Sequence, residues 1–310
     1  MSPTEPKAGH NIPVHFLQKF AHRIILPGFN GASLYVVSKY FIREMKVLNL
    51  QERAAAVTYN FLMAMPPTFL LLFSILPYLQ FRNVEPTILN LVNLLSPNQN
   101  IYNNVHGVLV DFMAKQHHDV LSYGVILVLF FSSNGIMGLM RSFDKSLSLY
   151  VKRTGLERRW RAVGLTLVLL TIIIIGLAVL IMQSRDLNPS IHKIFHSIKA
   201  VKMVSFLILA LLVFLAISVI YTFGPSLTHK FRFVSTGSVL ATIASVAATS
   251  IFFFLVNHFL NYNKLYGSIG TLIAFMVWVW INTLIILMGY LLNVSILLSE
   301  LSYGDTEIDG

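Results

Sequence analysis

Six long apolar runs, none of them interrupted by Asp, Glu, Lys or Arg, fill most of the second half of this chain and much of the first. A helix of about 20 apolar residues crosses the hydrocarbon core of a bilayer, so each run predicts a transmembrane helix. The runs cover residues 54–79, 120–140, 162–182, 203–223, 233–256 and 266–298. The sequence therefore predicts an all-α fold, a polytopic membrane helical bundle with six transmembrane helices.

The amount and placement of charge favour a membrane protein over a soluble one. Only 12% of the residues are charged and 55% are hydrophobic, whereas soluble domains carry about 25% charged residues. A net charge of +10 would suggest nucleic-acid binding in a soluble protein. Here most basic residues lie at the ends of the apolar runs, where they set topology and contact lipid headgroups. We expect membrane lipids as partners, with anionic headgroups at the cytoplasmic face, and no nucleic acid.

The distribution of Lys and Arg predicts the orientation of the bundle. Basic residues gather before the first run, between the second and third runs, and between the fourth and fifth runs. Cytoplasmic loops carry an excess of such residues. Six spans then place both the N-terminus and the C-terminus in the cytoplasm.

The predicted domain organisation has three parts. Residues 1–52 form a cytoplasmic N-terminal tail, in which the alternation of apolar and basic residues over 15–45 indicates amphipathic helices at the membrane interface. A soluble helical hairpin is the alternative interpretation of this stretch. Residues 53–299 form the transmembrane domain, and residues 300–310 form a short acidic cytoplasmic tail, in which we expect 303–310 to be disordered.

The spans contain amides, hydroxyls and aromatic rings but no mid-span acid or base. Coupling to protons or sodium ions through a buried charge is therefore not expected. We predict that the interior collects polar residues into a cavity, its candidates being Tyr59, Asn60, Asn134, Trp278, Asn282 and Asn293.

One stripe of the last run is open to two interpretations. Trp278, Asn282, Gly289 and Asn293 share one helix face because of their spacing. The stripe lines a polar cavity in one interpretation, and in the other, which we favour slightly, it makes interhelical amide bonds and a small-residue packing site.

Proline and small residues predict where helices bend and approach one another. Pro66 and Pro67 remove backbone donors in the middle of the first run and are expected to kink it. Gly237 begins a four-residue spacing of small residues in the fifth run, which is typical of close helix packing in lipid.

Catalytic and metal-binding patterns are missing from the sequence. The chain has no cysteine, and its scattered carboxylates do not form the cluster that a two-metal hydrolytic site needs. His192 and His196 are four residues apart, and His117 and His118 are adjacent, but no acidic residue accompanies them at ligand spacing. We therefore expect no enzyme activity, no metal and no cofactor.

Residues in both halves resemble the YihY/virulence factor BrkB family over about 48–298. The residues that carry the resemblance are Ala55-Ala56-Val57-Thr58-Tyr59 followed by Pro67, Tyr221-Thr222-Phe223-Gly224-Pro225, Gly237, Tyr262-Asn263-Lys264-Leu265-Tyr266-Gly267-Ser268-Ile269-Gly270, Trp278, Gly289 and Asn293. We expect Tyr266 to Ser268 to form a turn at the outer face, so that Tyr266 and Gly267 have a structural role.

The resemblance implies a six-span protein of the bacterial cytoplasmic (inner) membrane. Some members of that family are linked to serum resistance and envelope integrity, and many carry a ribonuclease BN label that is regarded as a misassignment. Three positions depart from the family pattern: Tyr290-Leu291 follows Gly289 where Ala-Glu is usual, Asp144 replaces an Asn, and Ala64 replaces a Ser.

Three functions follow as hypotheses. The first is transport or lipid handling in envelope maintenance, without coupling through a buried charge. The second is an envelope-assembly scaffold that acts through envelope protein partners. The third, and the least favoured, is a ribonuclease.

Overall fold

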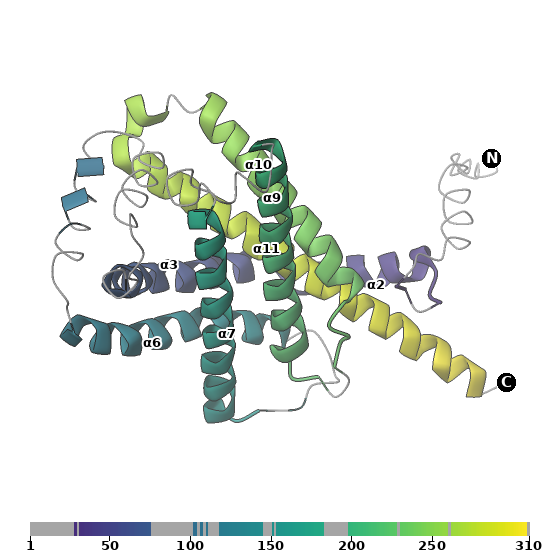
Figure 1. Cartoon of the computed structure of the whole chain (residues 1–310). Coiled ribbons are helices and arrows are strands. Elements are labelled where there is room, and N and C mark those ends of the chain that lie inside the picture. Colours follow the sequence, from purple (N-terminus) through teal and green to yellow (C-terminus); the bar gives the residue numbers. More distant parts are fainter. Residues whose placement is uncertain are drawn as a thin grey trace, which may run out of the picture. The chain divides into compact units, whose positions relative to one another are not determined.

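The part of the chain that the structure describes is helical. The structure is a computed structural model, and it describes residues 28–29, 31–75, 102–103, 106–107, 110, 118–144, 151, 153–182, 198–227, 230–259 and 262–308. Its helices within these ranges are α2 (Leu34–Val47), α3 (Leu50–Ile75), α6 (His118–Phe143), α7 (Gly155–Met182), α9 (Ile198–Phe223), α10 (Thr236–Phe259) and α11 (Tyr262–Ile308) (Figure 1). The all-α prediction is confirmed.

Five of these helices are long and apolar enough to cross a membrane. Their candidate spans are Gly124–Phe143, Gly155–Gly176, Met203–Phe223, Thr236–Leu255 and Ile273–Leu301. The predicted span at 54–79 falls mostly on α3, which is helical but is not one of the five among the described residues. The polytopic helical architecture is confirmed, and the count of six spans stays a prediction.

The chain divides into two compact units. Unit 1 comprises Met1–Leu48 and Leu291–Gly310, and unit 2 comprises Asn49–Tyr290. In unit 1, a small core of Phe29, Ala32, Val37 and Ile296 is flanked by Leu34 and Leu292. The apolar residues Ile42, Met45 and Val47 of α2 remain exposed, as expected for a helix that lies at a membrane interface.

The prediction of a disordered tail is wrong for the residues that the structure describes, because α11 continues to Ile308. The buried face of this helix reaches just past the end of the apolar run at residue 298. Val294, Ser295, Ile296 and Ser299 are all buried, and the two serine hydroxyls donate to carbonyls of the same helix. Beyond Ser299, Glu300 and Leu301 are exposed, so the helix continues further than its buried face.

The prediction of a turn at Tyr266 to Ser268 is also wrong. Helix α11 begins at Tyr262, so Tyr266, Gly267 and Ser268 lie within its first turns. A single glycine in a helix costs only about 1 kcal/mol relative to alanine. The long apolar sequence that follows is enough to keep these residues helical.

Glycines of α6 let α3 approach closely in unit 2, where the two helices are in contact. A Cβ added to Gly135 would lie 3.2 Å from the Phe61 ring, and one added to Gly138 would lie 3.2 Å from Asn60 Nδ2. The hydroxyls of Thr68 in α3 and Ser132 in α6 are 3.5 Å apart. Small residues on one helix thus accept larger side chains of its neighbour, as is usual for helices in lipid.

An aromatic cluster joins α6, α9 and α11 within unit 2. The rings of Phe143 and Tyr290 are stacked with centroids 4.1 Å apart, and Tyr221 meets both rings edge-on. The Tyr221 hydroxyl donates to the carbonyl of Ile286 at 2.6 Å. Beside this cluster, a Cβ on Gly289 would lie 2.5 Å from Tyr221 Oη. The absence of a side chain at Gly289 is what admits the tyrosine.

Candidate functional site

The predicted polar residues are held in separate places. Tyr59 is 60% exposed on α3, and Asn60 donates to the Ala56 carbonyl of its own helix. Trp278 and Asn282 bond to α10, and Asn134 bonds to α7. Asn293 belongs to unit 1, where it is buried. Among the described residues of unit 2, the polar candidates are therefore found in three places: on α3, between α6 and α7, and between α10 and α11.

The stripe on α11 makes interhelical bonds with α10. Trp278 Nε1 donates to Thr249 Oγ1 at 3.2 Å, and the Ser245 hydroxyl donates to Asn282 Oδ1. The Asn282 amide nitrogen donates to the Trp278 carbonyl at 2.9 Å. Since both groups of the Asn282 amide have protein partners, these contacts favour the packing interpretation over a cavity lining.

Replacing Asn282 by leucine is expected to destabilise the protein by about 1 kcal/mol, because an interhelical hydrogen bond in lipid contributes roughly that much. The measurement is thermal unfolding of the detergent-solubilised protein. Ser250→Ala is the matched control, since that hydroxyl donates only to the Val246 carbonyl of its own helix. Equal melting temperatures for the two variants would contradict an interhelical role.

Pro66 and Pro67 lie inside α3, which continues past them to Ile75. Proline lacks the backbone N–H, so the carbonyls of Leu62 and Met63 lose their usual helical donors. The Thr68 hydroxyl donates to the Ala64 carbonyl at 2.7 Å, one turn before it. This bond adds a local contact within the turn that carries the prolines.

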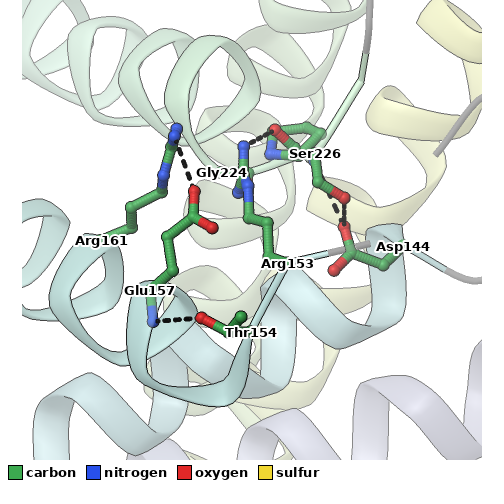
Figure 2. A network of polar contacts seen from close by, with 8 residues as sticks. Asp144, Arg153, Thr154, Glu157, Arg161, Gly224 and Ser226 are labelled. Carbon is green, nitrogen blue, oxygen red and sulfur yellow. Dashed lines mark hydrogen bonds and ion pairs between the residues drawn. The ribbon is translucent and has the colours of Figure 1, made fainter. Parts of the chain in front are cut away.

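Helix α7 begins before the apolar run at 162–182, so it includes residues that the hydropathy pattern assigns to a loop. The helix begins at Gly155, and the Thr154 hydroxyl accepts a hydrogen bond from the Glu157 backbone N–H at 3.2 Å. Glu157 also pairs with Arg161 at 3.0 Å (Figure 2). Thr-x-x-Glu is the sequence signature of a capping box. This signal, read at 154–157, would have placed Arg158, Arg159 and Arg161 on the helix.

Arg159 of α7 binds α6 through neutral groups. Its Nη1 donates to Asn134 Oδ1 and its Nη2 donates to the Phe130 carbonyl at 3.2 Å. Its guanidinium carbon lies 4.5 Å from the centroid of the Phe130 ring, a cation–π contact. Arg158 and Arg161, by contrast, each have a carboxylate partner.

Arg159 contacts α6 well away from the end of that helix, where Asp144 lies. The end of α6 and the start of α7 are joined there, because Arg158 pairs with Asp144 at 3.2 Å. At 1.5 Å per residue, Asn134 lies about 14 Å along α6 from Phe143, whereas the Arg159 backbone lies only about 6 Å beyond Gly155. The guanidinium therefore contacts the middle of α6, although its backbone lies near the start of α7.

Five arginines and two carboxylates, Asp144 and Glu157, lie at the end of α6, the start of α7 and the neighbouring segments. We call this region the basic end and define it by Arg53, Arg141, Arg153, Arg158 and Arg161. Figure 2 shows the part around Asp144, which accepts hydrogen bonds from the Ser226 backbone N–H at 3.3 Å and from its hydroxyl at 2.9 Å. The contact between Asp144 and Ser226 ties the end of α6 to the segment that follows α9.

Two arginines of the basic end cap the carboxyl ends of helices. Arg153 donates to the carbonyls of Gly224 and Pro225 at 3.0 and 2.8 Å, just after α9 (Figure 2). Arg53 donates to the Ser142 carbonyl of α6 at 2.9 Å. Positive charge at a helix carboxyl end offsets the helix dipole. Burial lowers the pKa of Arg153, and Arg161 lowers it further, but a guanidinium remains charged at neutral pH.

The described residues hold no group of three His, Asp or Glu that could bind a metal ion. His117, His192 and His196 lie outside the described part of the chain. What the described polar groups can do is bind an anion through arginine and hold helices together through hydrogen bonds.

Comparison with known proteins adds the family. The model of the virulence factor BrkB family matches residues 41–305. The chain belongs to this family. The resemblance found in the sequence is thereby confirmed, and the protein is a membrane protein with several apolar helices. The match includes all of α3, α6, α7, α9 and α10.

Relatives of this BrkB-family chain carry different names. It is 24% identical over 249 residues to the ribonuclease-like protein YfkH of Bacillus subtilis, an alignment that covers 78% of this chain and 88% of that protein. It is 30% identical over 76 residues to a UPF0761 membrane protein of Idiomarina loihiensis, which covers 24% of this chain and 27% of the relative. A UPF0761 membrane protein of Mannheimia succiniciproducens is 32% identical over 79 residues, 26% of this chain and 28% of the relative. No solved structure matches the chain.

Proposed function

We propose that the protein handles lipids in the bacterial cytoplasmic membrane, in support of envelope maintenance and without enzymatic activity. The observation that carries the proposal is the position of Arg159, whose guanidinium lies between α6 and α7 and contacts only neutral groups among the described residues. An ionisable residue in a membrane-spanning segment is expensive and by default indicates a functional site.

The side chains around Arg159 are apolar and exposed. Phe130, whose ring contacts the guanidinium, is 53% exposed, and Trp160 next to Arg159 is 69% exposed. Ile126 and Leu127 of α6 and Leu156 of α7 are also exposed. Exposed apolar side chains on membrane helices contact acyl chains, and tryptophan favours the headgroup level. A charged group among them offers an amphiphile both a polar anchor and an apolar path.

The chemistry of arginine also limits the mechanism. Its guanidinium does not release its proton at physiological pH, so this site cannot exchange protons in the way that a buried carboxylate does. We therefore propose that lipid handling proceeds without coupling to a proton or sodium gradient. The basic end is cytoplasmic in this proposal, because basic residues favour that side, and both termini are cytoplasmic.

A scaffold in envelope assembly is the second candidate. It is favoured by the exposed apolar residues Ile42, Met45 and Val47 on α2 of unit 1, which are able to contact an envelope protein partner as well as lipid. A ribonuclease receives no support from the described residues, because they hold no cluster of carboxylate or histidine side chains for phosphodiester hydrolysis.

Reconstitution into vesicles tests the proposal. The protein is placed in vesicles that contain a fluorescent phospholipid, and dithionite is added outside to quench the label that reaches the outer leaflet. We expect the protected fraction to fall faster than in vesicles that hold an unrelated helical membrane protein at the same protein-to-lipid ratio. Equal quenching in the two preparations would reject lipid movement and leave the scaffold as the better candidate.

A further inference from the structure

We propose that Arg159, together with Asn134 and Phe130, forms a binding site for the phosphate of one anionic phospholipid. This inference rests on the proposed function and names the ligand of the same site. It follows from three features of the site, which are the charge of Arg159, its donor geometry and the side chains that surround it.

The charge of Arg159 has no counter-charge among the described residues. Arg158 pairs with Asp144 and Arg161 pairs with Glu157, whereas Arg159 contacts an amide oxygen, a backbone carbonyl and an aromatic ring. A half-buried cation attracts an anion more strongly than a fully exposed cation does, because water screens it less. The ligand expected from charge alone is therefore anionic.

The donor geometry narrows the class of anion. Each of the two terminal nitrogens of the guanidinium donates one hydrogen bond to α6, one to Asn134 Oδ1 and the other to the Phe130 carbonyl. The remaining N–H groups have no partner among the residues that the structure describes. A planar guanidinium binds phosphate through paired N–H groups, more specifically than a lysine does.

The side chains around Arg159 identify a lipid as the source of the phosphate. Asn134, Phe130, Leu127 and Ile126 share one face of α6 and follow one another away from the basic end. Phe130, Leu127 and Ile126 are exposed. An acyl chain that begins at a phosphate on Arg159 would run along these side chains. Trp160 is exposed on α7, beside Arg159 in the sequence. A free phosphate would gain nothing from this apolar path.

Lipid titration followed by native mass spectrometry tests the site on the full-length protein. Phosphatidylglycerol is expected to bind Arg159→Gln about tenfold more weakly than wild type, which corresponds to one lost charge-assisted contact. Arg159→Lys is expected to bind with intermediate affinity. Arg161→Gln is the matched control. It removes a positive charge from the same part of α7, but that charge is already paired with Glu157. This variant is expected to bind phosphatidylglycerol as wild type does.

The other arms of the titration identify the source of the phosphate. Inorganic phosphate is expected not to displace bound phosphatidylglycerol, and binding of phosphatidylcholine is expected not to depend on Arg159. Displacement by inorganic phosphate, or wild-type affinity of Arg159→Gln for phosphatidylglycerol, would overturn the proposal.

A measurement on the wild-type protein keeps the proposal testable if the variants do not fold. A phosphatidylglycerol with a photoreactive headgroup is expected to crosslink to peptides that contain residues 126–134 or 156–160, and crosslinking confined to other helices would overturn the site. Loss of binding in Arg159→Gln without any lipid movement in vesicles would reject the function and keep the site. Wild-type lipid movement with no binding at Arg159 would reject the site and keep the function.

Discussion

Replacing Gly289 by alanine is expected to destabilise the protein by about 2–3 kcal/mol, at the upper end of the range for overpacked sites. A Cβ at this position would lie 2.5 Å from Tyr221 Oη, 2.7 Å from the Ala241 Cβ and 2.9 Å from the Gly237 carbonyl oxygen. These atoms belong to two different helices, α9 and α10, and one of them is a backbone atom, so no single side-chain rotation relieves the overlap. The Tyr221 hydroxyl is held besides by its bond to the Ile286 carbonyl.

The matched control is Gly164→Ala on α7. A Cβ there would meet nothing within 4 Å, and alanine is a better helix former than glycine by about 1 kcal/mol. We expect Gly164→Ala to leave the melting temperature unchanged or to raise it, while Gly289→Ala lowers it and reduces the yield of monodisperse protein. Similar melting temperatures for the two variants would show that α10 and α11 are not packed as closely as described.

The helices of this protein could be predicted from hydropathy because long uncharged runs have few stable alternatives in lipid. Their ends could not. The run at 162–182 begins only after Arg161, but the helix already starts at Gly155, next to the capping residue Thr154. Arginines end an apolar run without interrupting a helix, because arginine is a good helix former. Similarly, α11 continues through Gly267 and past residue 298, because neither a single glycine nor the end of an apolar run is enough to end a helix.

Periodicity predicts which polar residues share a helix face but not which partners they find. Trp278 and Asn282 share one stripe of α11, whereas their partners Thr249 and Ser245 come from α10 and depend on how the two helices are aligned. The role of Arg159 escapes the sequence for a related reason. Counting charges in loops assigns an arginine to the interface by its position in the sequence, and only tertiary contact shows that its guanidinium reaches Asn134.

Replacing Asp144 by alanine is expected to destabilise the protein by about 2–3 kcal/mol, because it leaves the buried Ser226 and the half-buried Arg158 without this partner. The carboxylate accepts two hydrogen bonds from Ser226 and pairs with Arg158. The side chains of Arg158 and Asp144 are 26% and 12% exposed, so little water replaces the lost contacts. Asp144→Asn is expected to be milder, since its amide oxygen is still able to accept from Ser226 while the ion pair with Arg158 is lost.

A comparison of Glu157→Gln with the Asp144 variants separates the effect of losing a charge from the effect of losing a buried charge on stability. Glu157→Gln also removes an ion pair with an arginine, but both side chains of that pair are 45% exposed, so we expect a loss below about 0.5 kcal/mol. Thermal unfolding of the variants in detergent gives the order Asp144→Ala, Asp144→Asn, Glu157→Gln from least to most stable. Raising the salt concentration is expected to reduce the small effect of Glu157→Gln and to leave most of the Asp144→Ala effect, because ions screen exposed charges far better than buried ones. A loss in Asp144→Ala as small as that in Glu157→Gln would mean that Ser226 and Arg158 find water instead, and that the basic end is open to solvent between α6 and the end of α9.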